Sequence, residues 1–586
     1  MMLKKKFLSL FLAVFMLASL LVSCSSNDTD ISDEVEKNQA RYTKTLVMYL
    51  MSETEVPENT DKEIEDALNE LTKSKYKTKL DLRFFTEDEY YTELEKALKA
   101  KETQVLKDKK EANELNEYNK YLKESCQAAG VPVVTVKVNG DNTAVTEEET
   151  MYNADYGIIE YKYPDAEENQ VNIFYLGGYD KYQEYIDKDW LASLDDEVQY
   201  SSKKLKEHIP EVYMNNIMAA GVYGIPTNSL LGEYTWMILD KDLMTKYHFT
   251  SNSISASFTD EDLYNFLDAV NVHERDENGE LTVLPIKGEL SPTNIFYWSY
   301  DAKTEMLVNK PSLLGIYSAN NAKIGDNLSV YSVFHDSNYV SQIKMLKRFE
   351  LADFYGTEAD QDKPFAMTVV KGSYDVYYEY SDKYYVKMME APKVDNSNLY
   401  NHMFCVNQLE NETARSMEIV TYLNTDPVAR NILQYGVEGE NYYIDDNDVL
   451  HRYNTSYMMD VNKTGNIFMA HPEEGKPGDF WDIGVEHCEN LAINPTFGFS
   501  VDASSNLDME AFNKVMALYD GYMERLDACK SLEEIDALVT SAKAELKENT
   551  YYTRITTILG PESNKDPSSL YFLYYSWLDM NGYIAK

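Results

Sequence analysis

The strongest constraint on the fold is an almost unbroken apolar run at residues 45–51, which suits a strand buried on both faces of a sheet. Two Thr-x-x-Glu capping boxes, beginning at Thr60 and Thr86, each open an apolar pattern with helical spacing. Between them, residues 80–84 alternate apolar and polar side chains as in a second strand. The order strand, helix, strand, helix predicts βαβ units in an α/β fold with a parallel sheet.

The alternation is interrupted over residues 101–169 and then resumes. A Lys/Glu-rich segment predicts a helix that runs to about Ala129, and Asn139-Gly140 predicts the turn of a hairpin. Buried-strand patterns return at residues 171–176 and 234–239. A chain of 586 residues is long enough for two or more domains or for one large two-lobed unit.

The N-terminus predicts export and lipid attachment. Three lysines precede an apolar run at residues 7–22, which is shorter than the roughly 20 residues that span a bilayer and fits a secretory signal. Leu21-Val22-Ser23-Cys24 resembles a bacterial lipobox, in which Cys24 becomes the lipid-bearing first residue. We therefore expect a signal peptide at 1–23, a flexible polar linker at 24–41, and a protein anchored at the extracytoplasmic face of the cell membrane. The alternatives are an ordinary secretory peptide with an incidental cysteine, or an uncleaved anchor.

The charge of the chain excludes some partners. The formal net charge is −44, and such an acidic surface repels nucleic acid and anionic lipid headgroups. Attachment to a membrane would therefore depend on the lipid at Cys24 and not on a basic patch. Hydrophobic residues make up 44% of the chain, which is enough to build sizeable cores.

Motifs for enzyme chemistry are absent from the sequence. There is no HExxH, GxSxG, Walker or GxGxxG motif. His487-Cys488 lacks further ligands at zinc spacing, and the acidic run at 445–448 lacks the glycine and distal glutamate of a calcium loop. The sequence therefore predicts no metal and no cofactor. Two carboxylates brought together by the fold could still form a glycosidase site, because the chain contains 99 acidic residues.

Five segments, in this order, resemble the extracellular solute-binding proteins of family 1, and most closely the large oligosaccharide-binding lipoproteins of Firmicutes ABC importers. The segments are residues 46–71, 172–195, 223–243, 422–442 and 495–500. The fourth is the most specific, since it contains YLNTDP followed by LQYGVEGENY. The similarity covers most of residues 42–586, although the insertion at 101–169 departs from shorter members of the family.

The resemblance implies a two-lobed α/β fold like that of type II periplasmic binding proteins, with a ligand cleft between the lobes. The expected first lobe comprises residues 42–228 and 365–495, and the second comprises residues 229–364 and 496–586. The implied function is capture of a carbohydrate, in particular an oligosaccharide, by closure of a hinge around it. The loaded protein would then dock on the permease subunits of an ABC importer, without catalysing a reaction.

Loops after buried strands and the segments that cross between the lobes supply the expected ligand-binding residues. Trp236 and Trp298 are the expected aromatic platforms for sugar rings, although each could instead be a half-buried core residue. The other expected contacts are Glu53, Tyr179, Asp180, Asn228, Glu233, Lys371, Tyr374, Phe497 and Phe499. Two other functions stay open: a surface glycan-active enzyme or glycan-binding lipoprotein outside ABC transport, and a peptide-binding protein of the same fold.

Overall fold

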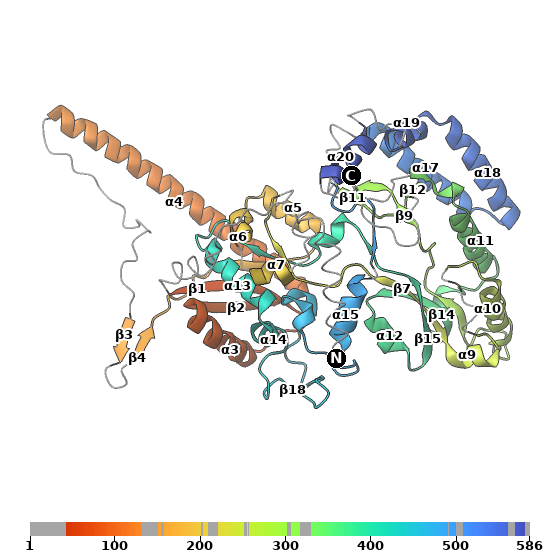
Figure 1. Cartoon of the computed structure of the whole chain (residues 1–586), viewed down its shortest axis with the longest axis horizontal. Coiled ribbons are helices and arrows are strands. Elements are labelled where there is room, and N and C mark those ends of the chain that lie inside the picture. Colours follow the sequence, from red (N-terminus) through yellow and green to blue (C-terminus); the bar gives the residue numbers. More distant parts are fainter. Residues whose placement is uncertain are drawn as a thin grey trace, which may run out of the picture.

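The computed structural model describes residues 43–129, 150–153, 158–200, 203–208, 221–250, 255, 257–301, 306–316, 330–489, 491–499, 508–560 and 569–580. The predicted signal peptide, Cys24, the linker at 24–41 and the hairpin turn at Asn139-Gly140 lie outside these residues. The described chain forms two lobes side by side, each with its own sheet (Figure 1). Within the described part, no helix is both long enough and apolar enough to cross a membrane.

A five-stranded sheet forms the centre of the first lobe. Its order is β2 (Thr78–Thr86), β1 (Lys44–Ser52), β5 (Ile173–Leu176), β17 (Met403–Val406) and β6 (Ile225–Pro226). Strand β1 runs parallel to β2 and β5, whereas β17 is antiparallel to its neighbours β5 and β6. Residues 46–51 are almost wholly buried. The prediction of a strand buried on both faces is therefore confirmed.

The helices after β1 and β2 test the two predicted capping boxes. Helix α3 (Glu58–Tyr76) begins two residues before Thr60, because the N–H of Asp61 already donates to the carbonyl of Pro57 at 2.9 Å. Thr60 is thus buried inside the first turn, and the predicted start at this residue is wrong. Helix α4 (Glu87–Ala129) begins directly after Thr86, as predicted. The hydroxyl of Thr86 donates to the carboxylate of Glu89 at 3.2 Å, which is a contact between the two side chains and not one of the side-chain-to-backbone bonds that define a capping box.

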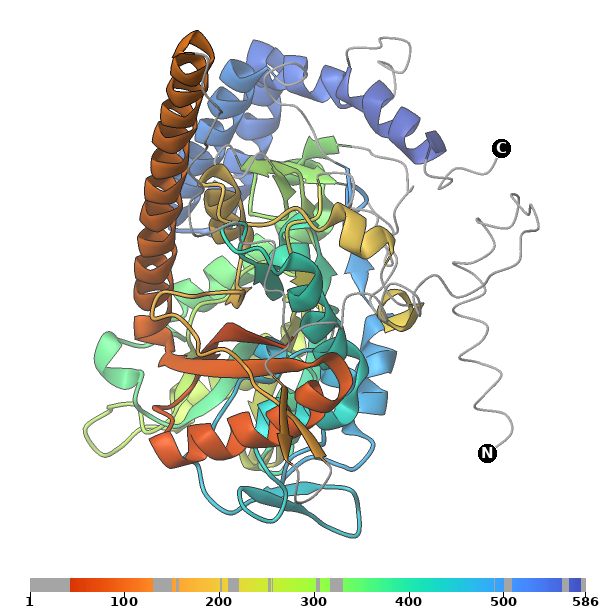
Figure 2. The ribbon, with the colours of Figure 1, turned by 90° about the vertical axis from the view of Figure 1, so that its left-hand side faces the viewer.

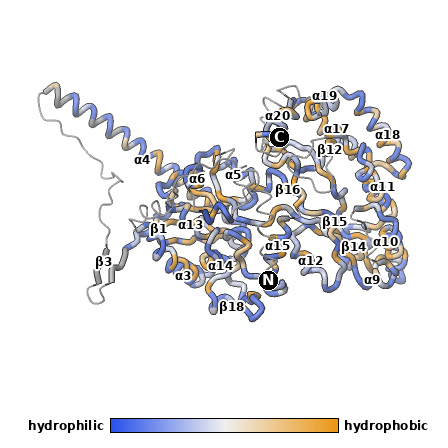
Figure 3. Tube along the Cα trace, viewed as in Figure 1, coloured by the Kyte–Doolittle hydropathy of each residue, from blue (hydrophilic) through white to orange (hydrophobic). Residues whose placement is uncertain are grey.

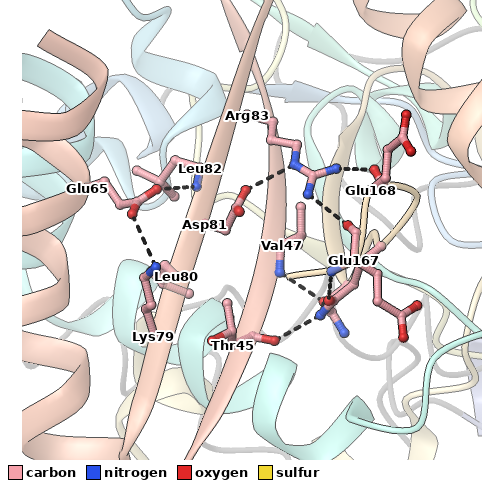
Figure 4. A network of polar contacts seen from close by, with 12 residues as sticks. Thr45, Val47, Glu65, Lys79, Leu80, Asp81, Leu82, Arg83, Glu167 and Glu168 are labelled. Carbon is pink, nitrogen blue, oxygen red and sulfur yellow. Dashed lines mark hydrogen bonds and ion pairs between the residues drawn. The ribbon is translucent and has the colours of Figure 1, made fainter. Parts of the chain in front are cut away.

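The insertion leaves and re-enters the first lobe at neighbouring points. Helix α4 extends well beyond the body, and its outward part is mostly hydrophilic (Figures 1 and 3). In the view of Figure 2, it stands in front of the rest of the chain. The chain returns through β3 (Thr150–Asn153) and β4 (Ile158–Tyr161) to the sheet. There the guanidinium of Arg83 donates to the carbonyls of Glu167 and Glu168 at 3.0 and 2.6 Å (Figure 4). These contacts fasten the returning segment to β2.

A four-stranded sheet organises the second lobe. Its order is β15 (Tyr384–Glu390), β7 (Tyr234–Asp240), β14 (Phe365–Gly372) and β8 (Leu284–Lys287). Both β14 and β15 are antiparallel to β7. We expected the chain to return to the first lobe at residue 365, but this pairing places residues 365–390 in the second lobe. The chain rejoins the first sheet only at β17.

Helices cover both sheets and complete the second lobe. The helices on the first sheet include α13 (Thr413–Thr425) and α14 (Pro427–Tyr435). The helices beside the second sheet are α9 (Lys241–Lys246), α10 (Glu261–His273) and α11 (Ser337–Leu351). A separate apolar core joins β9 (Phe296–Tyr297), β12 (Leu314–Ile316), α17 (Met509–Asp527), α18 (Leu532–Glu548), α19 (Thr550–Ile558) and α20 (Leu570–Met580). Between the two lobes, the short strands β16 (Lys393–Val394) and β20 (Ala492–Ile493) pair in parallel.

Candidate functional site

A cavity of about 620 Å³ lies where segments of the two lobes meet. The first lobe contributes residues within 398–402 and 461–467, and the second contributes residues within 230–235 and 371–375. Residues within 476–481, at the start of helix α15 (Phe480–Glu489), also line it. The cavity size falls within the roughly 300–1,000 Å³ typical of small-molecule sites, and its position between lobes is where such sites often occur.

The cleft contains many side chains that can bind hydroxyl groups. They include the amides of Asn309, Asn398, Asn401 and Asn462, the hydroxyls of Thr235, Ser291, Thr293, Ser373 and Ser397, and the charged groups of Glu233, Lys371, Asp375, Glu390, Lys393, Asp395 and Lys476. Its aromatic side chains are Tyr297, Phe480, Trp481 and Tyr519. Such a mixture of planar polar groups and a few aromatic faces suits a polar ligand with several hydroxyls.

Some of these charges hold the segments between the lobes in place. Lys393 on β16 forms an ion pair with Glu390 and also donates to the carbonyl of Ile295. Burial lowers the pKa of Lys393, although the nearby carboxylate of Glu390 acts in the opposite direction. The carboxylate of Asp395 accepts hydrogen bonds from the backbone N–H groups of Asn309 at 2.6 Å and Ser397 at 2.9 Å. These groups therefore have a structural role beside the β16–β20 pair.

Glu233 and Lys371 are less constrained. Both side chains are exposed and line the cleft, and neither has a side-chain hydrogen bond or ion pair among the described residues. Lys371 lies on β14 opposite Thr235 of β7, and Glu233 directly precedes β7. The sheet thus brings an ammonium and a carboxylate to one edge of the cleft. Both residues were predicted from the sequence to contact the ligand.

His402 is oriented by a tyrosine of the first sheet. Its Nδ1 lies 2.6 Å from the hydroxyl of Tyr175, and this hydroxyl is also 3.2 Å from the carbonyl of Asn401. Burial lowers the pKa of His402 from 6.5 to about 4, so the imidazole is neutral at neutral pH. A neutral imidazole has one donor and one acceptor, and Nε2 has no hydrogen-bond partner in the described part of the chain. His402 can therefore exchange one hydrogen bond with a ligand hydroxyl.

This histidine predicts a specific pH dependence of stability. Because the pKa of His402 falls from 6.5 to about 4 on folding, the unfolded chain binds the extra proton between these values. Its contribution is therefore complete above pH 6.5 and is lost progressively toward pH 4. We expect His402→Gln to reduce the loss of unfolding free energy between pH 7.5 and pH 5 by about 2 kcal/mol relative to wild type. Urea unfolding at both pH values measures this difference, and equal losses in both proteins would contradict it.

Trp481 is the tryptophan that lines the cleft. It is half-buried on α15, and its ring meets that of Phe480 edge-on at 5.0 Å. It packs against two apolar clusters, one around Tyr374 and Phe480 and one around Tyr435 and Leu450. Its indole N–H is enclosed and has no partner among the described residues.

The two tryptophans expected to bind sugar rings are core residues instead. Trp236 is 8% exposed, and its indole N–H donates to the carbonyl of Ser373 at 3.1 Å. Trp298 is 1% exposed and packs edge-on against Phe512, with ring centroids 5.5 Å apart. Neither ring lines the cleft. The aromatic-platform interpretation is therefore corrected in favour of the core alternative.

Two of the other predicted contacts, Tyr374 and Asn228, support the cleft from behind. The hydroxyl of Tyr374 donates to the carbonyl of Phe480 at 2.8 Å, and the carbonyl of Asn228 accepts from the N–H of Ile467 at 3.0 Å. Both interactions hold backbone segments that line the cavity. The remaining predictions lie outside its lining: Glu53 follows β1, Tyr179 and Asp180 begin α5 (Tyr179–Asp187), and Phe497 and Phe499 are buried.

Sequence reasoning missed Trp481, His402 and the cleft asparagines. The segment 396–402 contains three asparagines and a histidine between two strands, and this amide-rich loop was the available signal. Across the described residues, no group of histidine, cysteine, aspartate and glutamate side chains could hold a metal ion.

Comparison with known proteins identifies the fold. The sequence matches no protein-family model and no curated protein. Among solved structures, the N-glycan transport solute-binding protein of Streptococcus pneumoniae is 15% identical, with a TM-score of 0.57 over 92% of this chain and 99% of that chain. Its complex with Man1GlcNAc is also 15% identical and gives a TM-score of 0.51 over 92% and 100% of the two chains. The chain therefore has the two-lobed α/β fold of the solute-binding proteins.

Proposed function

We propose that this protein captures an oligosaccharide between its lobes and delivers it to an ABC importer. The observation that carries the proposal is the cleft between the lobes, which combines amide, hydroxyl and charged groups with the ring of Trp481. A sugar residue has an apolar C–H face and a rim of hydroxyls. An aromatic ring covers the C–H face, and planar polar groups bind neighbouring hydroxyls.

The two-lobed fold supports a mechanism based on closure. Asn398 and Asn462 line the cleft from the first lobe, and Glu233 and Lys371 line it from the second. A ligand that contacts all four binds the closed arrangement more tightly than an open one, and so shifts the equilibrium toward closure. The short β16–β20 pair lies where the lobes join and would accommodate the movement.

The fold relative suggests the first ligands to test. The Streptococcus pneumoniae protein is an N-glycan transport solute-binding protein that was crystallised with Man1GlcNAc. We therefore place N-glycan fragments first in a panel that also contains other oligosaccharides and short peptides. The permease subunits of an importer are the proposed protein partner, because the function of such a receptor is delivery.

Calorimetry and thermal shift on this panel test the proposal. We expect saturable binding of at least one oligosaccharide, without release of a product, and a stabilisation of about 2.7 kcal/mol at a ligand concentration of 100 Kd. Hydrolysis of a glycan would instead support the glycan-active enzyme. A response to peptides alone would support a peptide receptor, and no response from any compound would contradict binding of either class.

The lipid anchor is part of the same proposal and has its own test. We expect Cys24→Ala to move the full-length protein from the membrane fraction to the medium or periplasm of a bacterial host that processes lipoproteins. The reason is the strongly acidic chain, with a net charge of −44, which cannot hold to anionic headgroups without the lipid. Fractionation and immunoblotting measure the change, and a variant that stays membrane-bound would contradict the lipid anchor.

A further inference from the structure

A row of aromatic rings leads out of the cleft onto helix α12 (Asp375–Tyr380), which lies beside α15 (Figure 1). Trp481 and Phe480, which both line the cleft, are 5.0 Å apart between ring centroids. Phe480 lies 5.9 Å from Tyr378, and Tyr378 lies 5.6 Å from Tyr377. The row therefore connects the ligand cavity with the surface of the second lobe without a break.

Packing of the core explains the inner part of this row but not its outer end. Phe480 is 2% exposed and belongs to an apolar cluster, against which Tyr378 packs with part of its surface. Tyr377 is 46% exposed, and it belongs to none of the apolar clusters. Its ring offers an apolar face to solvent directly beyond the cleft.

Polar groups accompany these rings as they would at a sugar site. Asp375, the first residue of α12, lines the cleft, and its carboxylate is 3.9 Å from the ammonium of Lys476. That ammonium also lies 4.5 Å from the ring centroid of Phe480. Burial and the negative charge of Asp479 both raise the pKa of Tyr378. Carboxylates and an ammonium thus flank the aromatic faces, ready to bind hydroxyls.

We infer that Tyr377 and Tyr378 form an outer subsite for the sugar residues of an oligosaccharide that extends beyond the cleft. This inference rests on the proposed function, because it assumes that the cleft binds the inner part of the same ligand. It goes further because it states that the ligand is longer than the cleft and that the ligand leaves the cleft along α12. The ligand is a chain whose inner residues contact Trp481 and whose outer residues lie along α12.

A glycan array tests the subsite when it presents short and long members of several series, including N-glycan fragments, glucans, mannans, galactans and xylans. We expect wild type to bind a long member of its preferred series more tightly than the short member. Tyr377→Ala should raise the Kd for the long member about 3- to 10-fold and leave the Kd for the short member unchanged. Tyr378→Phe keeps the ring and should retain the preference for long members.

Two further tyrosine variants serve as controls. Tyr200 in the first lobe is 61% exposed, and Tyr200→Ala should change neither Kd. Tyr443 is 42% exposed on β18 (Tyr442–Ile444), and Tyr443→Ala tests whether the chain leaves the cleft in another direction. A loss of long-chain affinity in Tyr443→Ala but not in Tyr377→Ala would overturn the inference. Equal affinity of wild type for short and long members would do the same, whereas absence of all glycan binding would overturn the proposed function itself.

Discussion

Replacement of Trp481 with alanine is expected to weaken oligosaccharide binding by about 30-fold or more. Aromatic side chains at the centre of a binding site contribute at least about 2 kcal/mol, which corresponds to this factor. Trp481 is the tryptophan in the cleft lining, and it packs against two apolar clusters. The polar groups of the cleft would keep their positions but would lose the indole face beside them.

The same contacts mean that Trp481→Ala also lowers stability, so binding must be measured well below the melting temperature of the variant. Trp481→Phe keeps a smaller ring and should restore most of the affinity. Trp577→Ala is a matched control, because Trp577 is a partly buried tryptophan of α20 that does not line the cleft. Calorimetry on the three variants distinguishes a ligand contact from a general loss of structure. Unchanged affinity in folded Trp481→Ala would contradict the proposed role.

Replacement of Trp298 with alanine is expected to lower the free energy of unfolding by about 3–5 kcal/mol, the range for loss of a large aromatic side chain from a core. Trp298 is 1% exposed and packs against Phe512 of α17, which belongs to the helical core of the second lobe. Urea unfolding measures the loss.

Binding separates this core role from the sugar-platform role predicted from the sequence. The folded fraction of Trp298→Ala should bind oligosaccharide with the affinity of wild type, since the residue does not line the cleft. Trp298→Phe should lose less stability, because it leaves a smaller cavity. A variant of wild-type stability that failed to bind would return Trp298 to the ligand site.

Local patterns explain which parts of the fold could be predicted. The apolar run of β1, the alternation in β2 and the Lys/Glu-rich pattern of α4 each determine an element through contacts close in the sequence. The start of α14 is another example. There Asp426 accepts hydrogen bonds from the N–H groups of Val428 and Ala429, with Pro427 at the first helical turn.

The lobe boundary and most of the cleft could not be predicted, because they depend on contacts between residues that are distant in the sequence. A strand pattern at residues 365–372 does not reveal that its partner is β7, so the expected lobe boundary fell too early. His402 is oriented by Tyr175, 227 positions away in the sequence. The tryptophans raise a similar difficulty, because the aromatic run that ends at Trp298 suits a core strand as well as a sugar platform. Of the five tryptophans, all of which the structure describes, Trp481 alone lines the cleft, and its neighbour Phe480 continues the aromatic row outward.

The way in which the insertion joins the first lobe has a practical consequence. Lys101 forms ion pairs with Glu410 at 3.1 Å and with Glu167 at 3.4 Å, so the departing and returning segments are fastened at one point. Because the segments are held together there, the part of α4 after Lys101 can change in length without altering the distance between the points at which the insertion leaves and re-enters the lobe. The outward part of α4 is therefore a natural position at which to attach a fluorescent label or a fused domain while the cleft stays intact.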